Sequence, residues 1–381
     1  MLNYVTLSQQ QYADLLVNQI SSAEGPAPNV YQKPGDHTTI GYGYTFVRSN
    51  NLQLWQNAGI TLTSSEVTLL QSIDAAPTDA QRDSLALQFT RTITQGEAIV
   101  LLRQTYPEYE GPANALGMPF SEERAAFVSL TYNRGVGTVN TKMQAFFAAI
   151  GNQDRAEAWY QIRYNSNGRI NDPDLTQGAN GIANRRIAES NLFSLYDNPG
   201  QGVGEAEAKE VLRMYTTHRT DIQTYESKFS SQFAQSGTAT IQFQLISAET
   251  TLIANFAEGR TIDGEVLVGQ NDLWRGDILE GTMNGDLLLV PRTICFGVRP
   301  GTTRCRVVLA MISSKAALAL TRITTPPAMG MIGLRILMRT VSSRSTGRRS
   351  SAGSKKPGIM TGPVPMAPSR TACQARIWWS S

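Results

Sequence analysis

The 381-residue sequence is poor in the residue types that most often build metal sites and nucleophilic triads. It holds only two histidines, His37 and His218, and three cysteines that all lie after residue 290. That leaves little for a His-rich zinc site, and a Ser/His/Asp triad would have to use one of the two histidines. The cysteines give no indication of disulfides in the earlier part of the chain.

Long apolar runs are missing as well. No stretch reaches the length of a membrane span, and residues 1–6 lack the charged and apolar regions of a signal peptide. We therefore expect a soluble chain that does not insert into membranes. If it acts outside the cytoplasm, something other than an N-terminal signal must deliver it. The length allows two or three domains, and the 41% hydrophobic content allows a sizeable core in the first part.

Acidic residues are absent from residues 291–381, which hold 15 Lys and Arg, so residues 1–290 carry 19 basic and 31 acidic residues. The net charge of +3 hides this asymmetry. A basic tail is typical of nucleic-acid binding, but this one contains no recognised module. We therefore expect no nucleic-acid partner.

The stretch from Glu24 to Thr45 is the most informative in the chain. A helical pattern begins at Ser8, a plausible N-cap, and ends with Glu24, because Pro26 and Pro28 follow. A polar turn then leads to Thr39-Ile40-Gly41-Tyr42-Gly43-Tyr44, a short strand within a hairpin region. Apolar surroundings at a helix end can raise the pKa of a carboxyl, as a general acid requires, and a hydroxyl on a nearby strand can hold a water.

Helical patterns follow further along the chain. Residues 122–135 are small or apolar on nearly every face, which predicts a buried central helix capped by Ser121. Residues 181–193 begin the last helix of this part, and residues 197–202 read as a linker. Beyond it, residues 205–213 form a charged helical pattern, and the alternation over residues 238–246 predicts a strand.

Four of these pieces, in this order and spacing, resemble the phage-type lysozymes of glycoside hydrolase family 24 over residues 8 to about 196. They are Glu24-Gly25 at the helix end followed by Tyr31, the Thr-Ile-Gly-Tyr-Gly strand, the Arg-Ala-Ala helix running into Tyr-Asn-Arg-Gly, and Gly-Ile-Ala-Asn-Arg-Arg-Ile-Ala-Glu. The resemblance implies an α+β fold, with a small β-lobe, a mainly helical lobe and a sugar-binding cleft between them. It also implies hydrolysis of the β-1,4 bond between N-acetylmuramic acid and N-acetylglucosamine in peptidoglycan (EC 3.2.1.17).

The same resemblance assigns roles to residues. Glu24 would be the general acid, and Thr39 would help to place the attacking water. Asn133 lies where the family uses an amide near the cleft, and Arg185 where it uses a basic residue that supports the acid. Tyr31 is a candidate for binding the sugar, although strand or core packing is the alternative for each aromatic residue here.

The second carboxylate departs from the family pattern. The family places an Asp nine residues after its Glu, and this position is Lys33 here. The nearest carboxylate is Asp36, which we predict as the second catalytic group because the chemistry needs a negative charge on the opposite face of the sugar. An Asx turn is the alternative role for Asp36.

The end of the chain resembles a different family. Residues 281–289 look like one degenerate unit of the Gly/Asp nonapeptide repeat of RTX proteins, which bind calcium in a parallel β-roll. Read one base back, the codons of residues 298–321 can spell three such nonapeptides in register. We therefore predict that the frame slips near residues 289–293 and that the tail from about 291 is an out-of-frame translation, not selected to fold. Sequencing the gene for a one-base change that restores an open frame tests this.

These observations predict three segments: a lysozyme-like domain (1–198), a connector with a helix and strands that ends in an RTX-like unit (199–290), and an unfolded basic tail (291–381). The predicted protein is a monomeric muramidase that acts on peptidoglycan, as a bacteriolytic toxin or an endolysin, in the cell wall or periplasm of a target bacterium. We expect no cofactor for catalysis, and calcium only with an intact repeat module. A lytic transglycosylase and a non-catalytic peptidoglycan-binding module remain as alternatives.

Overall fold

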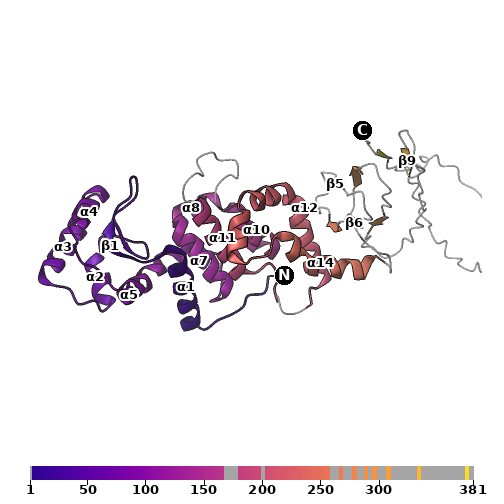
Figure 1. Ribbon diagram of the computed structural model, residues 1–381. Helices are drawn as coiled ribbons and strands as arrows, with labels where there is room; N and C mark the ends of the chain where they lie inside the picture. Colours follow the sequence, from indigo (N-terminus) through magenta and orange to yellow (C-terminus); the bar gives the residue numbers. More distant parts are fainter. Residues whose placement is uncertain are drawn as a thin grey trace, which may run out of the picture. The chain divides into compact units, whose positions relative to one another are not determined.

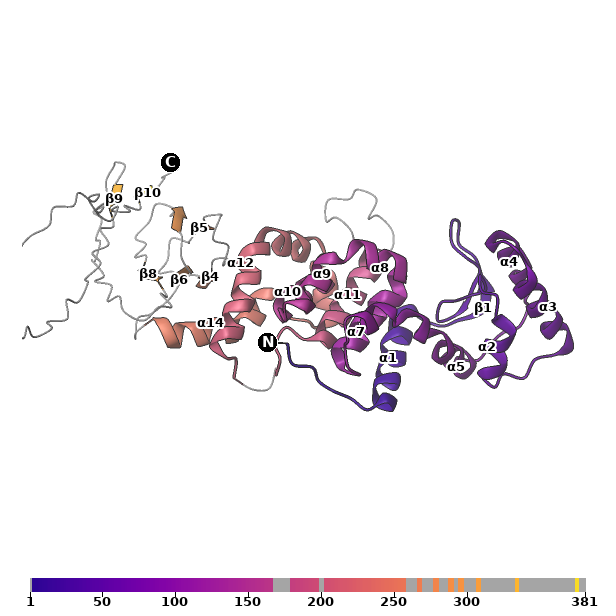
Figure 2. The same cartoon turned by 180° about the vertical axis from the view of Figure 1, so that it is seen from behind.

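The computed structural model describes residues 2–166, 179–198, 202–257 and 266–268, and the backbone of six short strands between residues 277 and 376. The chain divides into two compact units, Met1–Leu252 and Ile253–Ser381. Figures 1 and 2 show the chain from opposite sides. The predicted boundary at residue 198 stays a prediction, although α12 and α13, which follow it, belong to the first unit.

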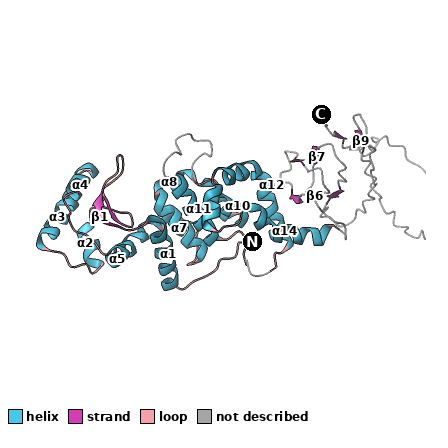
Figure 3. Cartoon of the chain, viewed as in Figure 1, coloured by secondary structure: helices cyan, strands magenta, loops and turns pink. Residues whose placement is uncertain are grey.

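The first unit is mostly helical with one small sheet (Figure 3), which confirms the predicted α+β lysozyme-like class. The sheet is antiparallel and contains, in spatial order, β1 (Ala27–Tyr31), β2 (Thr39–Gly41) and β3 (Tyr44–Thr45). The helices are α1 (Gln9–Glu24), α2 (Asn51–Asn57), α3 (Ser64–Ala75), α4 (Asp79–Ala86), α5 (Gln95–Thr105), η1 (Tyr106–Tyr109), α6 (Gly111–Ala115), α7 (Glu122–Arg134), α8 (Val136–Lys142), α9 (Gln144–Gly151), α10 (Arg155–Arg163), α11 (Ala179–Phe193), α12 (Glu205–Lys228), α13 (Ser230–Ser236) and α14 (Ile241–Phe256).

Helix α1 begins and ends where the sequence predicts. The Ser8 hydroxyl accepts from the amide of Gln11, and the Gln11 side chain accepts from the amide of Ser8, so a capping box closes the first turn. At the other end Gly25 has a φ of 67°, which a residue with a side chain rarely adopts, and the helix stops. Glu24 is therefore the last helical residue.

Helix α7 is the buried centre of the helical part, as predicted. Ser121 caps it by accepting from the amide of Arg124, and every residue from Glu123 to Thr131 is buried. Small side chains such as Ala125 and Ala126 let α1 and α11 pack closely against it. The helix therefore links the element that carries Glu24 to the element that carries Arg185.

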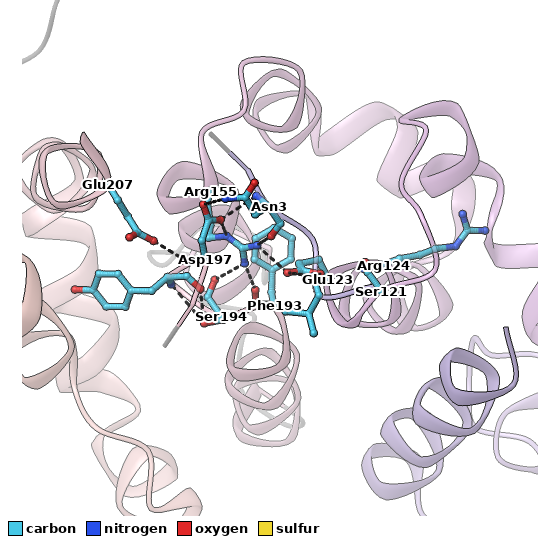
Figure 4. Close-up of polar contacts among 11 residues, drawn as sticks. Asn3, Ser121, Glu123, Arg124, Arg155, Phe193, Ser194, Asp197 and Glu207 are labelled. Atoms are coloured by element: carbon cyan, nitrogen blue, oxygen red, sulfur yellow. Dashed lines mark hydrogen bonds and ion pairs between the residues drawn. The ribbon is translucent and has the colours of Figure 1, made fainter. Parts of the chain in front are cut away.

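Arg155 on α10 fixes the N-terminal segment to this helical part (Figure 4). Its guanidinium donates to Glu123 on α7 at 2.7 Å, to Asp197 at 2.5 Å and to the carbonyl of Phe193 at 2.6 Å, and it also reaches the carbonyl of Asn3. The Arg155 side chain is only 3% exposed, and each donor has an oxygen partner, as a buried charge requires.

The predicted strand at residues 238–246 is wrong, because α14 covers most of it. Ile241, Leu245, Ala248 and Leu252 are its buried residues, and they recur at intervals of three and four, which is the period of one helix face. The alternation over the first few residues could not distinguish a strand from this pattern. Within the described ranges, no helix is both long and apolar enough to cross a membrane.

The described strands of the second unit pair in parallel. β4 (Val266–Val268), β6 (Leu287–Val290) and β8 (Arg306–Leu309) form one sheet, and β5 (Asp277–Glu280) pairs with β7 (Ile294–Gly297). Consecutive strands therefore alternate between two sheets. β9 (Gly333–Arg335) and β10 (Gln374–Arg376) pair antiparallel. Strands β7 to β10 lie in the tail for which we predicted no fold, and the RTX-type repeat and the frameshift stay predictions.

Candidate active site

Glu24 and Arg185, predicted as a functional pair, lie in direct contact. The Glu24 carboxylate forms an ion pair with Nη1 of Arg185, which stands on α11, 161 residues further along the chain. The Glu24 side chain keeps 29% of its surface exposed, whereas that of Arg185 keeps 5%. The pair therefore has a fixed buried cation on one side and a solvent-accessible carboxyl on the other.

The other nitrogens of Arg185 are anchored in the protein. Nε donates to Glu189 at 2.9 Å, and Nη2 donates to the carbonyl of Ser129 on α7 at 2.9 Å. Burial alone lowers the pKa of Arg185, but the negative charges of Glu189 and Glu24 outweigh this and raise the pKa above its ordinary value. The guanidinium is therefore a permanent charge held in one orientation.

Glu189 extends this contact into a buried chain of side chains. Its first carboxylate oxygen also accepts from the Ser129 hydroxyl at 2.8 Å, and its second accepts from Arg186 Nη1 at 2.5 Å. Arg186 Nη2 then donates to the side-chain oxygen of Asn133 at 2.6 Å. Asn133 is exposed at the end of α7, so this buried chain of side chains joins two of the predicted site residues, Glu24 and Asn133, through the core.

Two tyrosines that the sequence reasoning did not select lie near Glu24. The rings of Tyr109 on η1 and Tyr132 on α7 are 4.6 Å apart. Burial raises the pKa of both phenols, and the negative charge of Glu24 contributes to the rise in each. The aromatic residue before Asn133 in the Tyr-Asn-Arg-Gly segment was the available signal for Tyr132.

Thr39 is a buried residue of β2, with 9% of its surface exposed. Its hydroxyl donates to the carbonyl of His37 at 2.8 Å, so the oxygen has only acceptor capacity left. The turn before it is fixed by buried Asp83 on α4, whose carboxylate accepts from the amide of Thr38 at 2.7 Å and contacts His37 Nδ1 at 3.0 Å. The hydroxyl of Thr39 is thus set by the backbone around it.

Asp36 lies in the exposed turn between β1 and β2, and its described contacts do not include Glu24 or Thr39. Its amide donates to the carbonyl of Lys33 at 3.0 Å, and the side-chain amide of Gln32 donates to its carbonyl at 3.0 Å, so the backbone of Asp36, not its carboxylate, holds the turn. Lys33, at the position where a carboxylate was expected, is also exposed, and its Nζ lies 5.9 Å from the ring centre of Tyr31. The described contacts thus connect Glu24, Arg185 and Asn133, and they pair Tyr31 with Thr39 between β1 and β2. They join Asp36 to neither group.

Tyr31 and the glycine-separated tyrosines differ in burial. Tyr31 is 40% exposed at the end of β1, so its ring is accessible for stacking on a sugar. Tyr42 and Tyr44 are 3% and 2% exposed and belong to the core.

In the part of the chain that the structure describes, no three His, Cys, Asp or Glu side chains are arranged to hold a metal ion. The expectation of catalysis without a cofactor stays a prediction.

Comparison with known proteins gives one family. Residues 21–189 match the family model described as phage lysozyme, a segment that begins before Glu24 and ends at Glu189. No curated protein matches the chain. The match supports a phage-type lysozyme domain, and with it a glycosidase-type enzyme that acts on peptidoglycan. The residues after 189, including α12 to α14, lie outside the matched segment.

Proposed function

We propose that the chain is a muramidase that hydrolyses the β-1,4 bond between N-acetylmuramic acid and N-acetylglucosamine, with Glu24 as the general acid. The observation that carries the proposal is the position of Glu24. It is a partly exposed carboxyl at the end of α1, held by a buried arginine, within a segment that matches phage lysozyme. A general acid must reach the glycosidic oxygen while its own position is fixed, and this arrangement provides both.

The proposed reaction transfers one proton to the leaving sugar and one hydroxyl to the other. Glu24 protonates the glycosidic oxygen as its bond to the anomeric carbon breaks. The Thr39 hydroxyl, which donates a hydrogen bond to the backbone carbonyl of His37, accepts a hydrogen bond from the attacking water and orients it. Asp36 accepts the second proton of this water in the proposed mechanism, and the product has a free reducing end.

A lytic transglycosylase is the second candidate, and Lys33 favours it. The usual position of the second carboxylate carries a cation here, and the described contacts leave Asp36 in an exposed turn. A transglycosylase breaks the same bond without water, because the 6-hydroxyl of the muramic acid attacks its own anomeric carbon. It would need Glu24 but neither Asp36 nor Thr39, and its product is a 1,6-anhydro sugar.

Wall digestion followed by mass spectrometry tests the proposal. The full-length chain and its variants Glu24→Gln, Asp36→Asn and Lys33→Asp are incubated with purified cell walls, and turbidity and product masses are recorded. We expect clearing with reducing-end products, lost in Glu24→Gln and reduced in Asp36→Asn. Anhydro products with full activity of Asp36→Asn would instead identify a transglycosylase. Binding without clearing by every form would identify a non-catalytic module.

The matched control replaces an exposed carboxylate outside the site. Asp79→Asn on α4 removes a charge whose side chain is 57% exposed and whose ion pair, in the described part of the chain, is with Arg82 one helical turn away. It should clear walls like the parent chain, so that a loss in Asp36→Asn reports on position rather than on net charge.

We also propose that the enzyme acts as a monomer in the cell wall or periplasm of a target bacterium, as a toxin or an endolysin. The RTX-like unit at residues 281–289 supports an exported bacterial protein over a phage endolysin. The parallel pairing of β4 with β6, both of which precede residue 291, is compatible with a repeat-type module. Sequencing the gene across the codons of residues 289–293 tests the frameshift, which fails if no one-base change opens a Gly/Asp-rich frame.

A further inference from the structure

We infer that Glu189 is a positioning residue for the acid Glu24 and acts through the guanidinium of Arg185. The inference rests on the proposed function, because it assumes that Glu24 donates the proton. Glu189 is fully buried, touches no solvent and lies one helical turn from Arg185 on α11. It therefore cannot contact substrate, and any effect it has on the reaction must pass through its neighbours.

The first part of this role is orientation. Arg185 presents three nitrogens: Nε goes to Glu189, Nη2 goes to Ser129, and Nη1 remains for Glu24. The fork of a guanidinium is planar and rigid, so fixing two nitrogens fixes the direction of the third. Glu189 is fixed in turn by the Ser129 hydroxyl at 2.8 Å.

The second part is charge balance. In the buried chain, Arg185 and Arg186 face Glu24 and Glu189, so the positive and negative charges are equal in number. Arg134 adds a further cation nearby, and burial and then the charge of Arg186 lower its pKa. Without Glu189, two guanidiniums would be balanced only by the acid itself.

This balance affects the proton that the acid must carry. A guanidinium in contact with a carboxyl favours its ionised form, which cannot act as a general acid. Glu189 shares Arg185 with Glu24 and weakens that effect. Among the described residues, the phenols of Tyr109 on η1 and Tyr132 on α7 also interact with the charge of Glu24, and they are neutral at working pH because burial raises their pKa. Arg185 is therefore the cation whose strength at the acid depends on Glu189.

The test compares Glu189→Gln with Glu189→Asp in the full-length chain. Gln keeps the size and one acceptor oxygen but removes the charge, whereas Asp keeps the charge on a shorter side chain. We expect Glu189→Gln to lower kcat by about tenfold with little change in KM, and to move the high-pH limb of the activity profile down by about one pH unit. Glu189→Asp should restore the position of that limb.

Glu123→Gln is the matched control, because Glu123 is likewise buried, with 1% of its side chain exposed, and pairs with a buried arginine, Arg155, at 2.7 Å (Figure 4). It has no described contact with the chain of side chains that reaches Glu24. It should lower thermal stability as Glu189→Gln does, and leave the pH profile of the folded fraction unchanged. If Glu189→Gln behaves in the same way, the inference is overturned.

Two further variants keep the outcomes separate. Ser129→Ala removes the hydroxyl that donates to Glu189 at 2.8 Å and accepts from Arg185 Nη2 at 3.3 Å. It should shift the pH profile in the same direction by a smaller amount, even if Glu189→Gln fails to fold. An unshifted profile in Ser129→Ala would then count against the inference. Full activity of Glu24→Gln would overturn the proposed function itself, whereas an inactive Glu24→Gln with an unshifted Glu189→Gln would overturn only the role of Glu189.

Discussion

The hydroxyl of Tyr132 at the end of α7 donates a 2.7 Å hydrogen bond to the carbonyl of Tyr42 in the turn between β2 and β3. This bond connects the central helix, which carries Asn133, to the small sheet, which carries Thr39. Gly43 lies beneath the phenol, and a Cβ added there would meet its oxygen at 3.2 Å. The glycine after Tyr42 is therefore required by the close approach of Tyr132.

Replacing Tyr132 with Phe should weaken this connection. The change removes one hydrogen bond and leaves the Tyr42 carbonyl without that donor, so we expect a loss of about 1–2 kcal/mol in the free energy of unfolding. Wall clearing should fall by more than the folded fraction does, because the bond connects the sheet that carries Thr39 to α7, the helix on which Glu24-bearing α1 packs. Denaturant titration and turbidity measure the two effects.

Tyr12→Phe is the control for that experiment. The Tyr12 hydroxyl donates to Glu110 at 2.7 Å on the helical side, so its loss should cost a similar free energy without a specific loss of activity. Equal ratios of activity to folded protein in the two variants would show that the Tyr132 bond does not position the site.

A comparison of alanine variants at Gly43 and Gly59 distinguishes the stability cost of backbone strain from that of steric contact. Both have positive φ, 89° and 71°, but a Cβ at Gly59 would have no atom within 4 Å. Gly59→Ala should therefore cost about 1–2 kcal/mol for the left-handed backbone alone. Gly43→Ala should cost about 1–3 kcal/mol more, because the Tyr132 ring must move. Equal midpoints of chemical unfolding for the two variants would indicate that the Tyr132 ring moves without a cost in stability.

Local signals predicted the elements that such signals control. A capping box at Ser8 and a glycine followed by a proline after Glu24 determine both ends of α1, and these are readable from a few residues. The same approach failed at residues 238–246, because a short run of alternating apolar residues fits both the two-residue period of a strand and the 3.6-residue period of a helix. There, the burial of Ile241 and Leu245 against the rest of the first unit determines the helix, and burial is not visible in a local window.

The candidate site likewise combines residues that the sequence identifies with contacts that only the packing reveals. Glu24 and Arg185 were predicted through a family resemblance, but their contact spans 161 residues and depends on α1 and α11 both packing on α7. Glu189 was not selected, since an acid four residues after an arginine is usually an exposed helix pair. Only the packing of α7 shows that this pair is buried. The position of the second carboxylate is still a prediction, because Asp36 lies in a turn without described side-chain partners.

Helices beyond the matched family segment should be needed for stability. The ring of His218 on α12 stacks on Tyr160 of α10, with centroids 3.7 Å apart, and Glu226 accepts from the Tyr164 hydroxyl at 2.8 Å. These contacts bury apolar and aromatic surface of α10, which a shorter chain would expose to water.

Two shortened chains test this requirement. A chain of residues 1–257 should be soluble and melt cooperatively, whereas a chain of residues 1–198 should melt at a lower temperature and aggregate. Thermal melting and size-exclusion chromatography make the comparison. Equal melting temperatures would support the boundary at residue 198 that the sequence predicts, and would make α12 to α14 a separate element.

The pair of Glu157 and His218 should make stability depend on pH. Burial alone raises the pKa of Glu157, but the hydrogen bond and charge of His218, at 2.8 Å, outweigh it and hold the pKa below its ordinary value of 4.5. A carboxyl with a lowered folded-state pKa contributes stability above its unfolded-state value, and loses it as the pH falls through the folded-state value. Glu157→Gln should therefore be less stable than the parent at pH 6, and the difference should narrow below about pH 4.5.

Glu122→Gln provides a control of opposite sign. Burial, and then the charge of Glu123, raise the pKa of Glu122 above 4.5, so its ionisation in the folded state opposes folding as the pH rises through that value. Its replacement should remove a stability loss at pH 6 and have no such effect at pH 3. Denaturant titrations of the parent and both variants across pH 3–7 measure how the free energy of unfolding of each protein changes with pH. If the free energies of unfolding of Glu157→Gln and the parent changed with pH in parallel, the assigned pair would be contradicted. A carboxyl with an ordinary pKa in the folded state adds no pH dependence of its own to the stability.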